Sequence, residues 1–399
     1  MSAAPEDPAA LAREALARHE AGHLEEAREL YLELLTSQPR EAWVHNNLGH
    51  VLHQLRRLTE AEACYKRAIE LDQDLGDAQW NLCSLQLLRG EFEHAWPRFH
   101  YRHAVSRLPR RPQTRPLWQG EPLAGKTILL HKEYGFGDTI QFARYVPLVA
   151  ARGGQVVLEV QAEVMRLFQA LDGVDVLLRR GSEPPPFDFQ CGLMELPRVF
   201  NTTVTTIPAV PYLAANRVLE TAWQKRLPRG FKVGLVWSGN PNFPDAEYKC
   251  IPFDLLKPLF TVAGVTWISL QTGAAARGLT DLRDTTIDVA PLLHDFADTA
   301  AAIANLDLVI TVDTAVAHLA GALGKRVWLL LPFVPDWRWL LETDECPWYP
   351  SMRIFRQTER MSWAPVIERV AAELHASVKP PAAAGVMSRL KRHLTWSAR

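Results

Sequence analysis

Several features that mark particular classes of protein are missing from this 399-residue chain. Its five cysteines have no Cys-x-x-Cys spacing, which argues against a structural zinc site and favours a reducing compartment. A formal net charge of −1 argues against a role dominated by nucleic-acid binding. No apolar run reaches the length of a membrane span, and the first residues lack the basic and apolar segments of a signal peptide. We therefore expect a cytoplasmic protein.

The chain nevertheless has enough apolar residues to bury a large core. Hydrophobic residues make up 48% and charged residues 22%, which is an ordinary globular composition, and the length predicts two or three domains. A basic tail, residues 379–399, is expected to follow the last domain. It is either a frayed, flexible terminus or a short basic amphipathic helix in peripheral contact with an anionic membrane.

The first hundred residues repeat with a period of 34. Three columns of similar residues share this period: Ala27, Ala61 and Ala95; Tyr31, Tyr65 and Phe99; Leu24, Leu58 and Phe92. The pattern predicts tetratricopeptide repeats (TPR), which are stacked helix pairs, near 8–41, 42–75 and 76–109. The third weakens toward its end, where Pro97 interrupts the expected second helix. Such an array either offers a concave face to a protein partner or only supports the next domain.

Arginine and proline are enriched in residues 110–125, which is typical of a linker. After it, apolar runs alternate with helical patterns, and this predicts parallel α/β domains over 126–215 and 216–378. A proline-rich, weakly patterned stretch, 183–215, closes the first of them. Helices are expected at 162–171 and 216–227, and strands at 127–131, 156–160, 176–178, 233–237, 265–270, 308–312, 327–331 and 352–355.

The turn after the first of these strands is a candidate site. It contains Gly135 and Gly137, but Ile140 stands where a dinucleotide fingerprint requires its third glycine. The glycines instead let the backbone turn tightly, and Asp138 falls at the N-terminus of the next helix. From the residues alone, Asp138 is either a helix cap or a catalytic base.

Residues 308–332 form a second candidate site. They read as a buried strand ending at Asp313, a helix that Thr314 can cap and that carries Ala315 and His318, and a second buried strand. Ligands of open α/β sheets bind outside the carboxyl ends of strands, where helix N-termini suit phosphate, so a nucleotide-bearing ligand is the first hypothesis. The alternative is an ordinary crossover in which Asp313 is only a cap and His318 a packed ring.

Both segments resemble signatures of the bacterial heptosyltransferases, glycosyltransferase family 9. Residues 133–145 are similar to E-Q-G-x-G-D-T-[IL]-Q-F-x-R-Y, and residues 313–323 are similar to D-T-[GA]-x-x-H-L-A-x-A-L. The resemblance implies the GT-B architecture, in which two Rossmann-like domains face one cleft, and a reaction that needs no metal ion. It implies that Asp138 deprotonates the acceptor hydroxyl in a cleft formed by Glu133, Gly135, Gly137, Gln141 and Arg144.

The resemblance places the donor site in the C-terminal half. Relatives usually carry arginines in a loop resembling N-D-R-x-R-S-I-P, where this chain reads DAEYKCIP at 245–252, and Gln-Lys-Gly where it has Thr272 in the middle. Lys249, in the loop after the strand at 233–237, is either the best side-chain cation for a diphosphate or a solvated surface lysine. Arg338 either contacts phosphate or pairs with Asp336, and the tryptophans beside it either stack on a nucleotide or anchor the loop. The predicted donor residues are Ser238, Asn240, Lys249, Gln271, Asp313, Thr314, Ala315, His318, Asp336 and Arg338.

The predicted fold is thus α + α/β, with N-terminal TPR helices followed by two Rossmann-like domains. We expect a metal-independent bacterial glycosyltransferase that moves a sugar from a nucleotide-diphosphate sugar to a hydroxyl of a saccharide or protein, with the repeats binding or positioning a partner. One alternative is a catalytically weak or inactive scaffold for protein interactions. A further alternative is a protein glycosyltransferase resembling the O-linked N-acetylglucosamine transferases.

Overall fold

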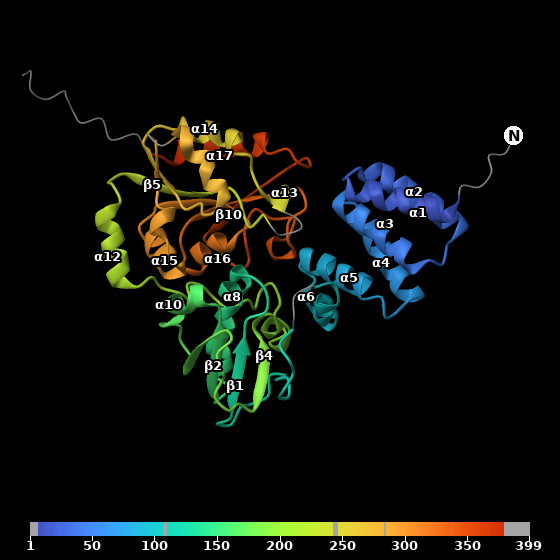
Figure 1. Ribbon diagram of the computed structural model, residues 1–399, viewed down its shortest axis with the longest axis horizontal. Coiled ribbons are helices and arrows are strands. Elements are labelled where there is room, and N and C mark those ends of the chain that lie inside the picture. The colour runs from blue at the N-terminus through green and yellow to red at the C-terminus, as the bar shows by residue number, and fades with distance from the viewer. Residues whose placement is uncertain (1–6, 107–109, 242–245, 283–284, 379–399) are drawn as a thin grey trace, which may run out of the picture.

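The computed structural model describes residues 7–106, 110–241, 246–282 and 285–378. Along the chain, an array of helices is followed by two α/β units, each built on one parallel sheet (Figure 1). The predicted basic tail, 379–399, and the start of the loop at 245–252 lie outside the described residues.

The array begins with regular helix pairs. Ala61 on the second helix of the second pair is fully buried and makes room for the buried ring of Tyr65. Gly49 faces the same ring so closely that a Cβ there would lie 2.7 Å from it. The small and aromatic columns of the sequence therefore form the contacts within and between pairs, which confirms the TPR prediction. The helices are α1 Pro8–Glu20, α2 Leu24–Ser37, α3 Ala42–Gln54, α4 Leu58–Leu71 and α5 Gly76–Leu88.

The third pair departs from this pattern after its first helix. Its second helix ends early, as α6 Phe92–Ala95, and is followed by a 3₁₀ turn, Trp96–Tyr101, and by α7 Arg102–Val105. Pro97 explains the break, because it has no N–H to donate to the carbonyl one helical turn earlier. Phe92, Trp96 and Phe99 of this segment belong to a core that the third repeat shares with both α/β units.

The turns inside the three repeats lie 34 positions apart, at residues 22, 56 and 90. All three have positive φ: 77° at Gly22, 58° at Arg56 and 80° at Gly90. Glycine adopts this conformation without strain, whereas arginine does not. We call these three turns the docking edge, because each contacts the α/β units.

The contacts of the docking edge run along one side of the C-terminal unit. Arg360 donates a hydrogen bond of 3.0 Å to the carbonyl of Gly22. The Arg56 guanidinium lies 5.0 Å from the centre of the Phe333 ring. A Cβ at Gly90 would lie within 4 Å of Val204 and Leu340. The array is therefore joined to the rest of the molecule along its length and not only through the linker.

The first α/β unit has the strand order β3-β2-β1-β4, all parallel. The strands are β1 Thr127–His131, β2 Gln155–Val160, β3 Val176–Arg179 and β4 Phe189–Gly192. The last was not predicted, because Gln190, Cys191 and Gly192 have neither an apolar run nor a clear alternation. Pairing on both sides defines it, with β1 on one side and, on the other, the predicted linker, where Trp118 donates its backbone N–H to the Gln190 carbonyl at 3.1 Å.

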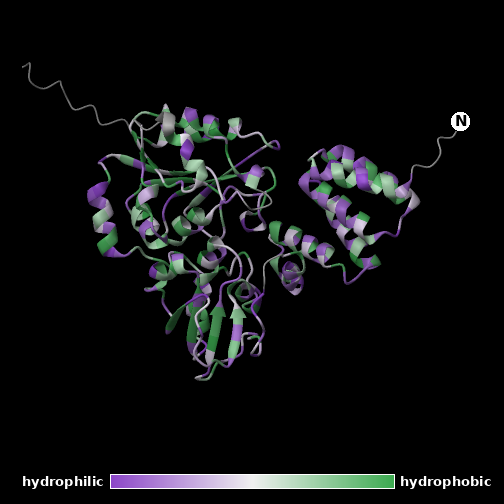
Figure 2. Ribbon diagram, in the orientation of Figure 1, coloured by the Kyte–Doolittle hydropathy of each residue, from purple (hydrophilic) through white to green (hydrophobic). Residues whose placement is uncertain are grey.

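Short helices cover this first sheet. They are α8 Phe136–Phe142, α9 Val146–Ala150, α10 Met165–Phe168 and α11 Leu196–Val199. The helix predicted at 162–171 is only a 3₁₀ turn followed by α10. Figure 2 shows that the strands of this unit are hydrophobic along most of their length, whereas the repeat helices alternate hydrophobic and hydrophilic residues.

The second α/β unit has the parallel order β10-β9-β8-β5-β6-β7. Its strands are β5 Phe231–Val236, β6 Val265–Ser269, β7 Thr286–Asp288, β8 Leu308–Val312, β9 Val327–Leu331 and β10 Met352–Arg356. Every residue of β8 and β9 is buried. The short edge strand β7 was not predicted. The helices are α12 Arg217–Arg226, α13 Ala246–Lys249, α14 Lys257–Phe260, α15 Phe296–Ala304, α16 Ala315–Ala322 and α17 Ala364–Ser377.

Strand order reverses at one point in each sheet. The chain moves outward from β1 through β2 to β3 and then returns to β4 on the other side of β1; in the second sheet it moves from β5 to β7 and returns to β8. Open α/β sheets bind ligands at such points, outside the carboxyl ends of the strands. The structure therefore has TPR helices followed by two Rossmann-like units, the GT-B arrangement expected from the sequence.

One large hydrophobic core extends through the third repeat and both α/β units, whereas the first two repeats have a core of their own. The array thus ends inside the α/β part of the molecule. Of the helices in the described ranges, none is both long and apolar enough to cross a bilayer.

Candidate active site

The two reversal points face each other across α8 and α16. Helix α8 follows β1 and α16 follows β8, and the two lie together where the α/β units meet (Figure 1). Gly137 on α8 is so close to α16 that a Cβ there would lie 2.8 Å from His318 Cδ2 and 3.7 Å from Ala315 Cα. The glycine therefore permits the close approach of the two units.

Asp138, the predicted base, is held at both carboxylate oxygens. Oδ2 accepts the backbone N–H of Gly135 at 2.9 Å, which caps α8. Oδ1 lies 2.5 Å from Nη2 of Arg338, which comes from the other α/β unit. The side chain remains 22% exposed, so it is a helix cap that a ligand can still reach. Both interpretations of this residue are therefore compatible with its position.

Arg338 is buried where the two α/β units meet and is hydrogen-bonded to residues of both. Its Nε donates to Oε1 of Gln141 at 2.7 Å and its Nη1 donates to Oδ1 of Asp336 at 2.9 Å, in addition to the contact with Asp138. Burial alone would lower the pKa of the guanidinium, but the neighbouring carboxylates of Asp336 and Asp138 outweigh it and hold the pKa above its usual value. Arg338 thus pairs with Asp336, as one of the two sequence interpretations requires.

Lys249 and Asp313 form the second charged pair of the site. Lys249, the last residue of α13, places Nζ 3.2 Å from Oδ2 of Asp313, directly after β8. The loop after β5 lies beside them, because a Cβ at Gly239 would be 3.7 Å from Thr314 Cγ2. The predicted cation, the end of β8 and the start of α16 are therefore together.

Thr314 occupies the N-cap position of α16, but the prediction that its side chain caps the helix is wrong. Its hydroxyl pairs with that of Thr311 at 3.2 Å, and α16 has no side-chain cap. Thr311 is buried at the end of β8 and its hydroxyl also lies 2.8 Å from the Val312 carbonyl, so the Thr314 hydroxyl is directed to the strand and not to the helix. Among the described residues no side chain caps the first N–H groups of α16, and a helix start of this kind is suited to an anion.

The side chain of the buried Gln271 is hydrogen-bonded to the backbone of the loop after β5 and of the loop after β6. Its Oε1 accepts the backbone N–H groups of Trp237 and Ser238 at 3.0 and 2.9 Å, and its Nε2 donates to the carbonyls of Ser238 and Thr272 at 3.1 and 2.9 Å. These contacts satisfy the amide. Gln271 thus shapes the loop that carries Ser238 and Asn240, and any effect on a donor is indirect.

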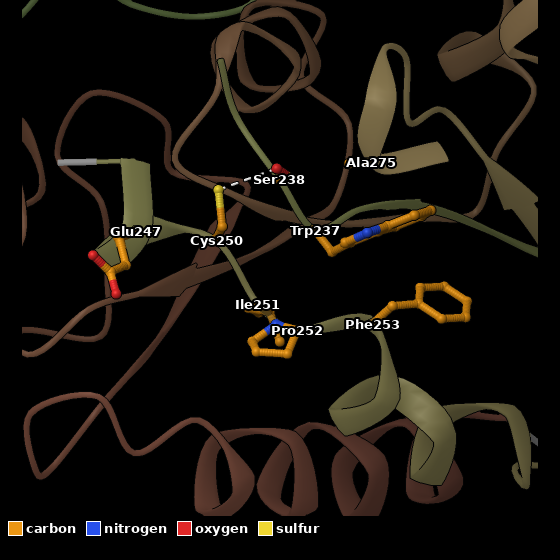
Figure 3. A pocket seen from close by; sticks show the side chains of 8 residues that line it. All are labelled: Trp237, Ser238, Glu247, Cys250, Ile251, Pro252, Phe253 and Ala275. Atoms are coloured by element: carbon orange, nitrogen blue, oxygen red, sulfur yellow. Dashed lines mark hydrogen bonds between the residues drawn. The ribbon is translucent and has the colours of Figure 1, made fainter. Parts of the chain in front are cut away.

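A cavity of about 370 Å³ opens at the carboxyl ends of β5 and β6. Figure 3 shows the rings of Trp237 and Phe253 on one side, Glu247 at the far end, and Ser238 hydrogen-bonded to Cys250 between them. The two rings are 5.0 Å apart. The volume lies in the range of small-molecule pockets. Sequence reasoning did not select the two aromatic residues; their only signal was their place directly after a strand and after Pro252.

The residues predicted for the acceptor cleft have different surroundings. Glu133, whose side chain is 8% exposed, pairs with Arg102 of the repeat region at 2.6 Å and accepts the backbone N–H of Met194 at 2.9 Å. Buried Arg144 donates to the carbonyls of Gln141 and Trp348, both at 2.9 Å. Glu133, Gln141 and Arg144 are therefore used in contacts between units. Among the predicted acceptor residues, Gly135, Gly137 and Asp138 lie at the partly exposed turn.

His318 is packed in the interior. Its Nδ1 lies 3.1 Å from the Tyr349 hydroxyl, and its ring stacks on Trp339 with 5.1 Å between centres. Burial lowers its pKa to about 3, so the ring is neutral near pH 7. This geometry matches the packed-ring interpretation of His318.

Taken together, the fold and the site define a GT-B glycosyltransferase-like protein with an N-terminal repeat array. Comparison with protein families adds two matches: a tetratricopeptide repeat at residues 42–75 and glycosyltransferase family 9 (heptosyltransferase) at residues 270–330. The second match spans the turn after β8, with Asp313 and His318. The chain therefore contains a TPR repeat and a glycosyltransferase family 9 region, as the resemblance of its motifs implied.

Individual proteins show more distant similarity. Protein FlbA of Caulobacter vibrioides is 27% identical over 332 residues, which cover 76% of this chain and 55% of FlbA. The chain thus spans about half the length of this curated relative. Among solved structures, E. coli ADP-heptose lps heptosyltransferase II matches with 14% identity and a TM-score of 0.47, over 63% of this chain and 98% of that one. A family 9 glycosyl transferase from Veillonella parvula matches with 11% identity and a TM-score of 0.45, over 60% and 88%.

Proposed function

We propose that the protein transfers a sugar from a nucleoside-diphosphate sugar to a hydroxyl group of a saccharide or protein acceptor. One observation carries the proposal: α8, which bears the partly exposed carboxylate of Asp138, packs against α16, and the start of α16 directly follows Asp313, the partner of Lys249. Glycosyl transfer needs a base on the acceptor side and positive charge on the leaving-group side. The two reversal points supply one group each.

In this mechanism, Asp138 takes the proton of the acceptor hydroxyl. The acceptor oxygen then forms a bond to the anomeric carbon, and the bond between that carbon and the phosphate oxygen breaks. Lys249 and the first N–H groups of α16 stabilise the charge that develops on the departing diphosphate. We propose that these groups act without a metal ion.

The cavity at Trp237 and Phe253 is the proposed site for the nucleoside. Its aromatic side accommodates a base, and Cys250 on its wall follows Lys249 directly in the chain. A ligand in this cavity can therefore extend its phosphates toward Lys249 and Asp313. The donor base and sugar are not specified by these contacts.

The second candidate function is a non-catalytic scaffold. It is favoured by the pairing of the main charges within the protein itself, Asp138 with Arg338 and Lys249 with Asp313, and by Thr272, which stands where relatives usually have lysine. A scaffold would use the repeats for a protein partner and would not need to bind a donor.

Ligand binding separates the two candidates. A ligand that binds only the folded state raises its apparent stability, by about 2.7 kcal/mol at one hundred times its Kd. We expect one of ADP, UDP, GDP or CMP to raise the unfolding temperature of the wild type, and the shift to shrink in Asp313→Ala. The absence of a shift with all four nucleotides would favour the scaffold.

Turnover tests the role of Asp138. We expect Asp138→Asn to abolish transfer while leaving the protein folded, because Asp336 continues to compensate the charge of Arg338. The matched control is Asp172→Asn, an exposed residue in the same α/β unit. Full activity of Asp138→Asn would refute the assignment of this residue as the base.

A further inference from the structure

Trp337 is enclosed by aromatic side chains of the third repeat. Phe92, Trp96 and Phe99 each present a ring edge-on to it, with 6.2, 6.3 and 6.2 Å between centres. Trp348 closes the remaining side at 6.1 Å, and Trp337 is only 4% exposed. We call the four surrounding rings the aromatic cage. Three of its four members come from the repeat array.

Arg338 follows Trp337 in the same 3₁₀ turn and rests on it. Its guanidinium carbon lies 4.5 Å from the centre of the Trp337 ring, and on its far side the guanidinium reaches Asp138 and Gln141 of α8. Contacts therefore run without a break from the third repeat through Trp337 and Arg338 to Asp138. Buried, close-packed groups of this kind transmit a displacement, because the interior has no free volume to absorb it.

The position of the Asp138 carboxylate depends on few contacts. Gly135 fixes one oxygen through its backbone N–H, and Arg338 fixes the other. A base must be placed within a fraction of an ångström of its target, and a misplacement of about 1 Å costs on the order of a hundredfold in rate. Loss of the Arg338 contact would leave the carboxylate free to rotate about the single remaining bond.

We propose that Arg338 is a positioning residue for Asp138, and that the third repeat holds Arg338 in place through the aromatic cage. The repeat array is then a structural part of the active site. The inference rests on the proposed function, since it assigns the positioning of the same base. It also gives the interrupted second helix of the third repeat a purpose, because the break at Pro97 is what turns Trp96 and Phe99 toward Trp337.

The test uses the full-length protein and compares variants of similar severity. Phe99→Leu and Trp337→Phe alter the chain of contacts while keeping an apolar side chain. Phe355→Leu is the matched control, because Phe355 is also buried but belongs to a separate core in the second α/β unit. Arg56→Gly is a second control. It removes the contact between Arg56 and Phe333 of the docking edge, and it introduces the residue type found at the equivalent turns, Gly22 and Gly90.

Kinetics provides the first readout. We expect Phe99→Leu and Trp337→Phe to lower kcat by about tenfold to a hundredfold with the KM for the donor within about twofold of the wild type, because positioning acts on the chemical step. Both controls should leave kcat within about twofold. Arg338→Lys should recover part of the activity that Arg338→Gln loses. Equal losses in Phe99→Leu and Phe355→Leu would overturn the proposal, because they would reflect stability alone.

Hydrogen exchange provides a readout that does not need turnover. In Phe99→Leu we expect faster amide exchange in residues 135–142 and 336–340, and unchanged exchange there in Phe355→Leu. If the wild type transfers no sugar and this local acceleration occurs, the proposed function fails while the link from repeat to Asp138 stands. Unchanged exchange at 135–142 in Phe99→Leu overturns the link, whatever the activity.

Discussion

Replacement of Gly137 by alanine tests how the two α/β units are held together. The new Cβ would lie 2.8 Å from Cδ2 and 3.4 Å from Nε2 of His318. The histidine has nowhere to move, because it is hydrogen-bonded to Tyr349 and stacked on Trp339. We therefore expect Gly137→Ala to force α8 away from α16 and to destabilise the protein.

The size of the effect is the difference between two terms. Carbon atoms in contact normally lie about 3.5–4.0 Å apart, so the units must separate locally by roughly 0.7–1.2 Å. Overpacking of this kind costs about 1–3 kcal/mol, and the immobile ring places this site in the upper half of that range. Alanine returns about 1 kcal/mol through its higher helix propensity. The expected net loss is about 1–2 kcal/mol, or roughly 1–2 °C in melting temperature for a chain of 399 residues.

The assay is thermal and urea unfolding of Gly137→Ala beside Gly135→Ala. Gly135 lies two positions earlier in the same turn, where a Cβ would have its nearest neighbour, Asp138 Oδ2, at an ordinary 3.5 Å. Its φ of −80° is open to alanine, so the expected cost there is only the loss of glycine's preference for the N-cap position, below about 1 kcal/mol. A Gly137→Ala protein that melts at or above the wild-type temperature would refute the packing described for this contact.

Three other predictions concern charge. The pKa of His318 is lowered to about 3 in the folded state, so the unfolded chain binds one more proton below its ordinary value of 6.5. The free energy of unfolding should therefore fall as the pH is lowered from 6.5 to about 3. In His318→Gln this dependence on pH should be weaker by up to about 1.4 kcal/mol per pH unit, and equal slopes in the variant and the wild type would contradict the prediction. Arg102→Met removes the guanidinium that lies 2.6 Å from both Glu133 and Glu195, and because Glu195 keeps its bond to Arg198, urea unfolding should show a loss of about 3 kcal/mol; a loss below about 1 kcal/mol would argue against the pairing. Lys249→Gln should weaken calorimetric binding of a nucleoside diphosphate about tenfold, because Asp313 is then no longer neutralised, whereas Lys249→Arg should retain binding; equal affinity of both variants would exclude the lysine from the site.

Much of the fold could be predicted because its strongest signals are local. Strands β1, β8 and β9 begin and end at the predicted residues, since each is a mainly apolar run that is buried over nearly its whole length. The repeats were predicted from their period. Strands β4 and β7 could not be predicted, because their short, mixed sequences carry no strand pattern of their own and become strands only through pairing, β4 with β1 and β7 with β6.

The candidate site was predictable at the level of segments but not of contacts. The motifs did locate the two turns that meet, yet Asp138 and Arg338 are 200 residues apart, and so their pairing has no sequence signal. For the same reason, the sequence could not indicate that Glu133 forms an ion pair with Arg102, or that Arg144 donates a hydrogen bond to the carbonyl of Trp348, 204 residues away. A motif identifies residue types, whereas their partners are decided by tertiary packing.

The docking edge has a consequence for how this architecture can change in length. Each turn meets a different point of the α/β units, in the order Gly22 with Arg360, Arg56 with Phe333, and Gly90 with Leu340. A helix pair added before Pro8 would extend the array and leave all three contacts in register. A pair inserted between existing repeats would move at least one turn away from its contact point, because each repeat adds a fixed step along the array. The array can therefore gain a repeat at its N-terminal end without losing a contact, whereas the positions of the three existing repeats are fixed by the α/β units.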